Sequence, residues 1–317
     1  MATDSLIDLD GQYRALREGA GVIDRSERGK LLVSGHDALE FLQGQLTNDV
    51  EAIAPGAGCY AALLDRKGHM QADMRILRFE ADRLWIDLEP EALNAVVRHL
   101  SRYRVGQEVE ISDRTGEEAV LCVIGPGAGA ATGADGLHPE HAHRELDVGG
   151  VPCRAVVTDL GIDVICASSE AGSVVAALLA TGAERVSEAA AEIIRVESGR
   201  PRFGREMSSA TIPQEAGIDD RAVSFTKGCY IGQETVARLH YRGKPNRHLR
   251  GLRLDGPVAD GDSITLETRD VGQIGTAVVS PAQGRIALAV IRREAEPGSR
   301  VSVGETGVGA EVVALPF

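Results

Sequence analysis

Residues 227–234 read Lys-Gly-Cys-Tyr-Ile-Gly-Gln-Glu, and this octapeptide is the most informative stretch of the 317-residue chain. Two glycines bracket Cys229, and a helical pattern begins at Gln233. A thiol beside Lys227 and near a helix N-terminus is expected to have a lowered pKa, because positive charge favours the thiolate. The alternative interpretation is a buried, inert cysteine, which is the commoner fate of this residue type.

The octapeptide lies inside a basic segment, residues 221–253. Eight Lys and Arg residues there stand against one acid, a net charge of +7, whereas the whole chain carries −13, so the remaining residues carry −20. A basic segment in an acidic protein concentrates anions locally, which favours a site for a polycarboxylate or phosphate ligand. The alternative is a solvated linker face, because charge runs are weak evidence for a site. Extended RNA binding is disfavoured because the segment is short.

The composition of the whole chain narrows the class of protein. A net charge of −13 argues against a direct nucleic-acid partner and against a membrane partner. The five cysteines are odd in number and form no Cys-x-x-Cys pair, so we expect neither a disulfide scaffold nor a Cys₄ zinc site. The first residues show no signal-peptide pattern, and no apolar run approaches the roughly 20 residues that span a bilayer. These features predict a soluble protein in the cytoplasm.

Hydrophobic periodicity predicts an α+β protein with a β-rich C-terminal part. Residues 58–88 alternate and turn like a β-meander, and residues 91–104 have the apolar stripe of a helix. Residues 199–225 show little periodicity, and a connection of that length is usually functional. From about residue 249, short alternating strands are separated by Gly, Pro and Asp turns, which predicts a small antiparallel barrel or sandwich.

The octapeptide, followed by Val236-Ala237-Arg238, closely resembles the signature of the YgfZ family, folate-binding relatives of the glycine-cleavage T-protein (aminomethyltransferase). Three further motifs resemble those of this superfamily in the same order along the chain. They are Phe41-Leu42-Gln43-Gly44-Gln45-Leu46-Thr47-Asn48-Asp49-Val50, Asp65-Arg66-Lys67-Gly68-His69-Met70, and Arg195-Val196-Glu197-Ser198-Gly199-Arg200-Pro201 with Gly204 and Glu206.

The resemblance implies a three-domain cloverleaf around a central hole of folate size, with a C-terminal antiparallel β-barrel. It implies a discontinuous first domain, residues 1–49 with 114–240, that binds the folate. Residues 50–113 would form an inserted α+β domain, and residues 241–317 the barrel.

The resemblance also assigns residues to tetrahydrofolate. Asp73 matches the superfamily aspartate beside the reactive folate nitrogens, and Glu206 matches the glutamate that hydrogen-bonds the pterin ring. An acid at position 73 could polarise or deprotonate a pterin nitrogen, and a carboxylate at position 206 can accept two N–H bonds. The alternatives are a solvated strand acid paired with Arg75, and an exposed loop acid beside Arg205.

The basic segment contributes further candidates. Lys227 is predicted to be a cofactor-binding residue. Arg238, Arg242 and Lys244 are candidates for the glutamate tail of a folate, which can be polyglutamylated, because guanidinium donors suit carboxylates. We predict no metal site, although a histidine-rich stretch, His138, His141 and His143 with Glu140 and Glu145, lies in a loop; it lacks a fourth ligand of defined spacing.

The cysteine motif belongs to the YgfZ branch, and T-proteins generally have an aromatic residue at the position of Cys229. The resemblance therefore implies a folate-dependent accessory protein for the synthesis or repair of iron–sulfur client proteins, including radical-SAM enzymes that modify tRNA, with Cys229 and Asp73 as reactive residues. An accessory factor is favoured over a classical enzyme. A folate-dependent aminomethyl- or methyltransferase is the alternative, and a protein that acts by interaction alone is the third hypothesis.

Overall fold

The computed structural model describes residues 8–317, which form two compact units. One unit consists of residues 8–26 with 117–195, and the other of residues 27–116 with 196–317. Among the described residues, no helix has both the length and the apolar character needed to cross a bilayer.

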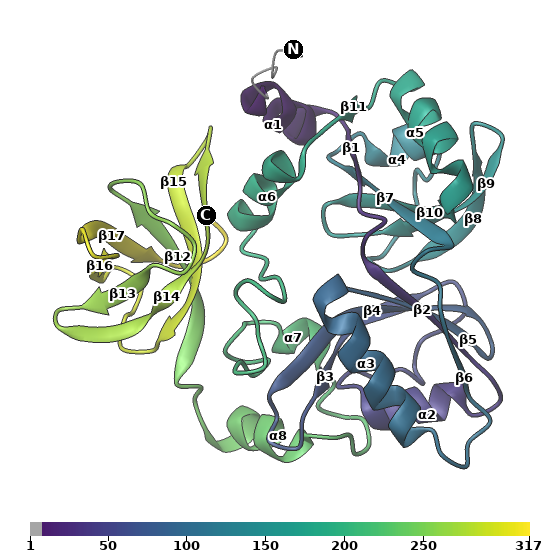
Figure 1. Cartoon of the computed structure of the whole chain (residues 1–317), viewed down its shortest axis with the longest axis horizontal. Coiled ribbons are helices and arrows are strands. Elements are labelled where there is room, and N and C mark those ends of the chain that lie inside the picture. Colours follow the sequence, from purple (N-terminus) through teal and green to yellow (C-terminus); the bar gives the residue numbers. More distant parts are fainter. Residues whose placement is uncertain (1–7) are drawn as a thin grey trace. The chain divides into compact units, whose positions relative to one another are not determined.

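The first unit is a six-stranded sheet with short helices (Figure 1). Its strand order is β11-β1-β7-β10-β9-β8. A core of small and branched apolar side chains joins the sheet to helix α5 (Ala171–Ala180). The other elements are α1 (Leu9–Glu18), β1 (Gly21–Asp24), β7 (Glu118–Ile124), α4 (Ala128–Thr132), β8 (His143–Val148), β9 (Val151–Val157), β10 (Gly161–Ala167), β11 (Glu184–Arg185) and α6 (Glu188–Glu197), whose last two residues belong to the second unit.

The second unit contains a five-stranded sheet in the order β3-β4-β5-β2-β6. Two helices cover one of its faces through a common apolar core, in which Phe41, Val96 and Ile76 are among the buried residues. The elements are β2 (Gly29–Ser34), α2 (Ala38–Gln45), β3 (Gly58–Leu64), β4 (Met70–Glu80), β5 (Arg83–Leu88), α3 (Pro90–Tyr103) and β6 (Glu110–Asp113). The predicted meander and helix are confirmed.

The opposite face of this sheet is covered by the chain from Phe203 to Val236. Ala62 and Leu64 of β3 point to this face and contact Met207, Tyr230 and other apolar residues of the covering chain. That chain includes α7 (Asp219–Ala222) and leads to α8 (Gln233–Arg242). The long segment with little periodicity is thus an ordered cover on the sheet.

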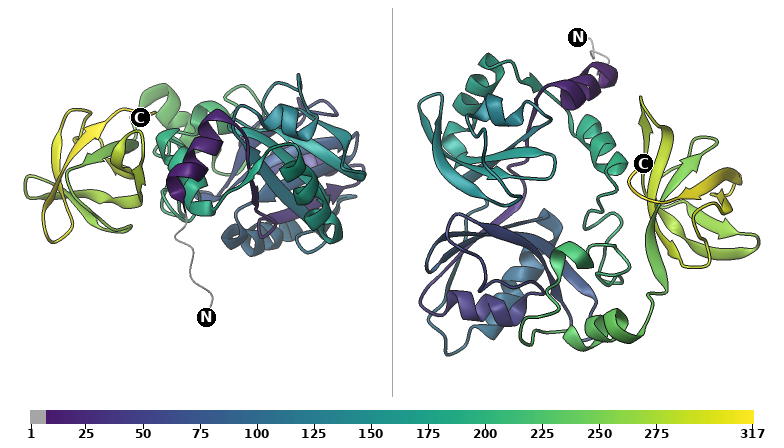
Figure 2. Two further views of the ribbon diagram at one scale, coloured as in Figure 1. Left: turned by 90° about the horizontal axis from the view of Figure 1, so that it is seen from above. Right: turned by 180° about the vertical axis from the view of Figure 1, so that it is seen from behind.

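The C-terminal part of the second unit is a closed antiparallel barrel of six strands (Figure 2). The strands are β12 (Arg247–Leu254), β13 (Ser263–Leu266), β14 (Arg269–Ser280), β15 (Gly284–Arg292), β16 (Arg300–Val303) and β17 (Val308–Val313). The predicted α+β class with a C-terminal antiparallel barrel is confirmed.

The strand pairing also bears on the domain boundary expected at residue 50. Strand β2 lies between β5 and β6, with Leu31 opposite Ile86 and Asp113. The sheet therefore contains strands from both sides of residue 50. Both β5 and β6 form their backbone hydrogen bonds with β2, which lies before residue 50. Local sequence carries no information about this long-range pairing.

Candidate functional site

Asp73 lies on the polar face of β4, the face covered by residues 203–236. Its neighbours Ala72 and Met74 point into the helix-covered core, so the alternation of the strand directs Asp73 to the other side. The Tyr60 hydroxyl donates a 2.6 Å hydrogen bond to Asp73 Oδ2. Asp73 Oδ1 is buried and has no hydrogen-bond partner within residues 8–317. One oxygen is thus fixed and the other is left for a donor.

The surroundings of Asp73 favour its protonated form. Burial raises the pKa of Asp73 to about 6, and the carboxylate of Glu89 acts in the same direction, while the hydrogen bond from Tyr60 opposes both. A carboxyl with a pKa near 6 can exchange a proton close to neutral pH, which is the property a general acid or base needs.

Arg75 does not pair with Asp73; the alternative of a solvated acid paired with Arg75 is wrong. Arg75 lies opposite Asp87 on β5 and donates to its Oδ2. Arg28 donates to Asp87 Oδ1 at 2.7 Å. Burial acts to raise the pKa of Asp87, but the two guanidinium groups outweigh it and hold the pKa at about 2. Asp87 is therefore a permanently ionised part of the sheet.

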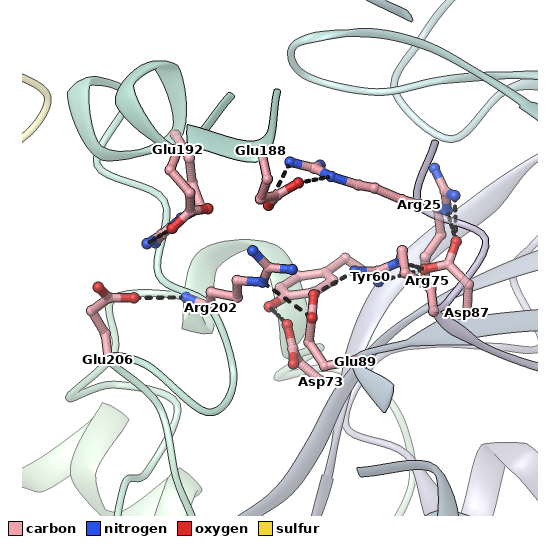
Figure 3. A network of polar contacts seen from close by, with 12 residues as sticks. Arg25, Tyr60, Asp73, Arg75, Asp87, Glu89, Glu188, Glu192, Arg202 and Glu206 are labelled. Carbon is pink, nitrogen blue, oxygen red and sulfur yellow. Dashed lines mark hydrogen bonds and ion pairs between the residues drawn. The ribbon is translucent and has the colours of Figure 1, made fainter. Parts of the chain in front are cut away.

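Glu206 is buried rather than an exposed loop acid, with 6% of its surface accessible. Its Oε2 accepts a 3.0 Å hydrogen bond from the backbone N–H of Arg202. The Arg202 side chain donates from Nε to Glu89 Oε2 at 3.1 Å, and Glu89 also pairs with Arg28. Arg202 thus connects the Glu206 loop to the sheet face that carries Asp73 (Figure 3).

Sequence reasoning did not identify Tyr60, Glu89 and Arg202, nor the ion pair of Arg28 with Asp87. Ala62 lies directly opposite Asp73, so Tyr60 is a diagonal neighbour, a distance that an aromatic side chain spans. Arg202 directly follows the Arg195–Pro201 motif, so a wider motif would have included it. Glu89 precedes Pro90 at the start of α3 and gave no comparable signal.

Cys229 lies in a turn that packs on the hairpin of residues 65–68. All five cysteines are free, and Cys229 is the exposed one. Gly232 has a φ of 86°, and a Cβ there would lie 2.4 Å from the Asp65 carbonyl oxygen. Gly68 likewise approaches Thr235. The two glycines let the turn and the hairpin approach closely, which places the thiol at the surface.

Lys227 is held by backbone carbonyls. Its Nζ donates to the carbonyl oxygens of Gln43, Leu46 and Asn48 at 2.5, 2.7 and 3.0 Å. Burial lowers the pKa of Lys227 to about 8, and the acids nearby oppose this. These three bonds use all the donors of a lysine ammonium group and satisfy the end of α2. They give Lys227 a structural role, and its assignment to a cofactor stays a prediction.

Arg238 and Arg242 are exposed on α8, one turn apart. Neither has an ion pair or hydrogen bond with any described residue, so both are available to an external anion. Lys244 follows in the exposed link to β12. The histidine-rich stretch is part of no group of three or more metal-ligating side chains among residues 8–317.

The unsatisfied oxygen of Asp73 fits the expected binding of a pterin at this site. A pterin carries N–H donors, and Asp73 Oδ1 is a buried acceptor without a protein donor among the described residues. Leaving such an oxygen unsatisfied is costly, so a ligand donor at this place would be stabilising.

Residues 8–227 match the family model described as the GCVT N-terminal domain. A chloroplastic protein of Arabidopsis thaliana, which carries the name of a candidate transferase, is 29% identical over 98% of this chain and 74% of its own length. An aminomethyltransferase of Mycobacterium tuberculosis is 31% identical over 96% of this chain and 88% of its own length.

A solved structure has the same fold. The crystal structure of the glycine cleavage system aminomethyltransferase T from Bartonella henselae superimposes with a TM-score of 0.87 at 21% identity, over 98% of this chain and 89% of that one. The T-protein-like fold inferred from the motifs is confirmed.

Proposed function

Because the chain belongs to the GCVT N-terminal domain family, we propose that it binds tetrahydrofolate, with Asp73 and Glu206 at the pterin. The observation that carries this proposal is the buried Asp73 Oδ1, an acceptor without a donor among residues 8–317. Glu206 adds a second buried carboxylate on the covering chain. Arg202 connects the segments that bear the two acids.

The tail of the folate is assigned to the basic segment. Arg238 and Arg242 are exposed guanidinium groups that no described acid neutralises. Guanidinium forks bind carboxylates in a bidentate manner, so a polyglutamate tail is expected to bind more tightly than a single glutamate.

The function that we favour is an accessory role in the synthesis or repair of iron–sulfur proteins, with Cys229 as the reactive group. Its exposure supports this role, because a thiol must reach a client protein to exchange with it or to ligate its iron. The cysteine in the octapeptide also distinguishes the YgfZ branch from the T-proteins, which generally have an aromatic residue at this position. The net charge of −13 supports a protein without a direct nucleic-acid partner, and the five free cysteines support a reducing compartment such as the cytoplasm.

A folate-dependent aminomethyl- or methyltransferase is the second candidate. The pKa of about 6 at Asp73 suits proton transfer near neutral pH. The relatives named aminomethyltransferase favour this candidate as well. What the bound folate would supply is a one-carbon carrier, while Asp73 would hold or move a proton and Glu206 would orient the ring.

Calorimetry with tetrahydrofolate tests the binding proposal. We expect saturable binding of tetrahydrofolate to the reduced protein. Binding to Glu206→Gln should be at least about tenfold weaker, because the glutamine keeps only one of the two carboxylate oxygens that can accept N–H bonds from the pterin. Glu305→Gln, at an exposed barrel position, is the matched control and should bind as the unchanged protein does. Absence of binding to the unchanged protein contradicts the proposal.

Two variants separate the candidates. If the accessory role holds, Cys229→Ser fails to support iron–sulfur client enzymes in cells while it still binds tetrahydrofolate. If the transferase role holds, Cys229→Ser is fully active, and Asp73→Asn loses turnover of tetrahydrofolate with an amine donor. Full support of the clients by Cys229→Ser therefore contradicts the favoured function.

A further inference from the structure

A cleft of about 490 Å³ opens in the second unit between the loop of residues 204–211 and the outer surface of the barrel. Neither the folate assignment nor Cys229 uses the barrel side of this cleft. Its size is within the range of cavities that hold small molecules. The charged and polar side chains that face it include Arg205, Arg247, Asp270, Gln273 and Ser263.

The barrel wall of the cleft is a row of residues paired across adjacent strands. Val290 lies opposite Gln273, and Gln273 lies opposite Ser263. Residues paired in this way share one face of the sheet, so their side chains form one continuous surface. The row has an apolar end at Val290 and a polar end at Ser263.

Backbone hydrogen bonds hold the loop wall of the cleft in place. Gly204 N–H bonds the Met207 carbonyl at 2.8 Å, and Met70 N–H of β4 bonds the Thr211 carbonyl at 2.9 Å. A Cβ at Gly275 would lie 2.8 Å from Glu206 Cγ, so the glycine allows the loop to approach β14 closely. The cleft is therefore a preformed feature of the unit.

The charges on the walls cancel. Arg205 and Arg247 contribute two positive groups, and Glu206 and Asp270 contribute two negative ones. Arg205 is already paired with Asp260 at 2.9 Å. Arg247 is exposed and has no ion pair or hydrogen bond with any described residue, although its charge acts on the carboxyl of Glu215. A simple anion or cation gains little from such a balanced set, whereas a ligand that carries both charges gains from each.

Arg247 of β12 and Asp270 of β14 lie on the two strands that flank β15. Arg247 of β12 lies opposite Arg292 of β15, and Gly272 of β14, two residues after Asp270, lies opposite Ile291. Two strand spacings separate their backbones, about 10 Å. Asp270 Oδ1 accepts a bond from Gly272 N–H at 2.9 Å, which leaves Oδ2 for an external donor.

We propose that this cleft binds a small zwitterion, an α-amino acid, whose carboxylate pairs with Arg247 and whose ammonium group pairs with Asp270. A guanidinium fork suits a planar carboxylate, and an ammonium group suits a carboxylate oxygen. Gln273 and Ser263 offer hydrogen bonds to a polar side chain of the ligand. This site does not depend on the proposed folate function.

The test is ligand-observed NMR followed by calorimetry on the full-length, folate-free protein. The probes are glycine, serine and glutamine at about 10 mM, well above a Kd of about 1 mM. Acetate and methylamine are single-charge probes. We expect saturable binding of at least one amino acid and at least about tenfold weaker binding of both single-charge probes, since each lacks one ion pair.

Variants assign the binding to the cleft. Arg247→Gln and Asp270→Asn should each weaken amino-acid binding by about tenfold, and the asparagine keeps the acceptor for Gly272 N–H. Arg285→Gln and Glu305→Gln alter exposed barrel charges outside the cleft and should change nothing. Failure of every amino acid to bind, equal binding of acetate alone, or unchanged binding by both cleft variants overturns the proposal. Because folate is absent from this experiment, its result is independent of the folate titration.

Discussion

At the scale of single residues, the chemistry of the site depends on how the surroundings of each buried carboxyl group shift its pKa. Asp73 and Asp87 lie on neighbouring strands of one sheet, yet the pKa of Asp73 is raised to about 6 and that of Asp87 is lowered to about 2. Burial acts to raise both, and Asp87 differs because Arg75 and Arg28 lie against it. Among residues 8–317 no guanidinium group forms an ion pair with Asp73, and the weaker action of Arg28 does not outweigh burial, which makes this acid suitable for proton transfer.

Asp73→Asn should stabilise the protein at neutral pH. The pKa of Asp73 is about 6 in the folded chain and about 3.9 in an unfolded one, so the folded state binds more protons between these values. Stability therefore falls as pH rises through this window, by about 3 kcal/mol in all. The asparagine cannot ionise and can still accept the bond from Tyr60.

Urea unfolding at a series of pH values measures this effect. The variant should be more stable than the unchanged protein above about pH 6, and the difference should disappear below about pH 4. Asp82→Asn, at an exposed turn, is the control and should show no such dependence. A difference in stability that is independent of pH contradicts the raised pKa.

Cys229 should be the thiol that reacts in the native protein. Cys122, Cys153 and Cys166 are buried and so are shielded from the reagent, and burial raises the pKa of both Cys59 and Cys166 to about 12, so few thiolates form at these two positions. Mass spectrometry after brief treatment with iodoacetamide should show one modification, at Cys229, and five after unfolding. Cys229→Ser should show none under native conditions, and rapid native labelling of any other cysteine argues against this assignment.

At the scale of elements, two turns determine where the motif cysteine lies. The hairpin after β3 and the turn before α8 meet through backbone atoms, because Gly232 brings its backbone against the Asp65 carbonyl. Lys227, two residues before the cysteine, connects the same segment to the end of α2. The octapeptide thus connects α8 to the β3–β4 hairpin and to the end of α2, in addition to carrying the candidate reactive cysteine.

Gly232→Ala should lower the free energy of unfolding by about 2–3 kcal/mol, since the alanine has an unfavourable φ of 86° and a Cβ that meets backbone. Gly228→Ala is the matched control in the same octapeptide, because no atom lies within 4 Å of the Cβ that it would add. Thermal unfolding of the two variants compares them. Equal melting temperatures would show that the turn can move away from the hairpin without cost.

At the scale of the whole molecule, each unit has to be considered as a body with its own core. In the second unit, a cluster of apolar residues joins the outer surface of the barrel to the C-terminal end of α6. The buried members are Val196, Leu249, Ile286 and Leu288. The Ser280 hydroxyl donates to Glu197, and Phe317 N–H bonds the Glu197 carbonyl at 3.1 Å. The barrel is therefore attached to its unit by both a core and polar contacts.

Leu288→Ala should destabilise the second unit by about 2–4 kcal/mol, because it removes a fully buried side chain from this cluster. Val279→Ala, at a position on β14 that is 60% exposed, should change stability by less than about 0.5 kcal/mol. Urea unfolding followed by circular dichroism measures both. A barrel that unfolds separately, without loss of stability elsewhere in the unit, contradicts this attachment.

The sequence by itself determined the T-protein-like superfamily and the class of fold. These depend on local information: the order of residues in the octapeptide, the alternation of Met70–Glu80, and the Gly and Pro turns between the barrel strands. Each of these patterns is complete within a few neighbouring residues, so it can be recognised without the tertiary structure.

Only the tertiary structure decided which partner each polar group has. The bond from Tyr60 to Asp73, the three carbonyls around Lys227, the burial of Glu206 and the cleft against the barrel all join residues far apart in sequence. The position of β2 between β5 and β6 is of the same kind. Such contacts follow from strand register and from the closure of long loops, and no local pattern specifies either.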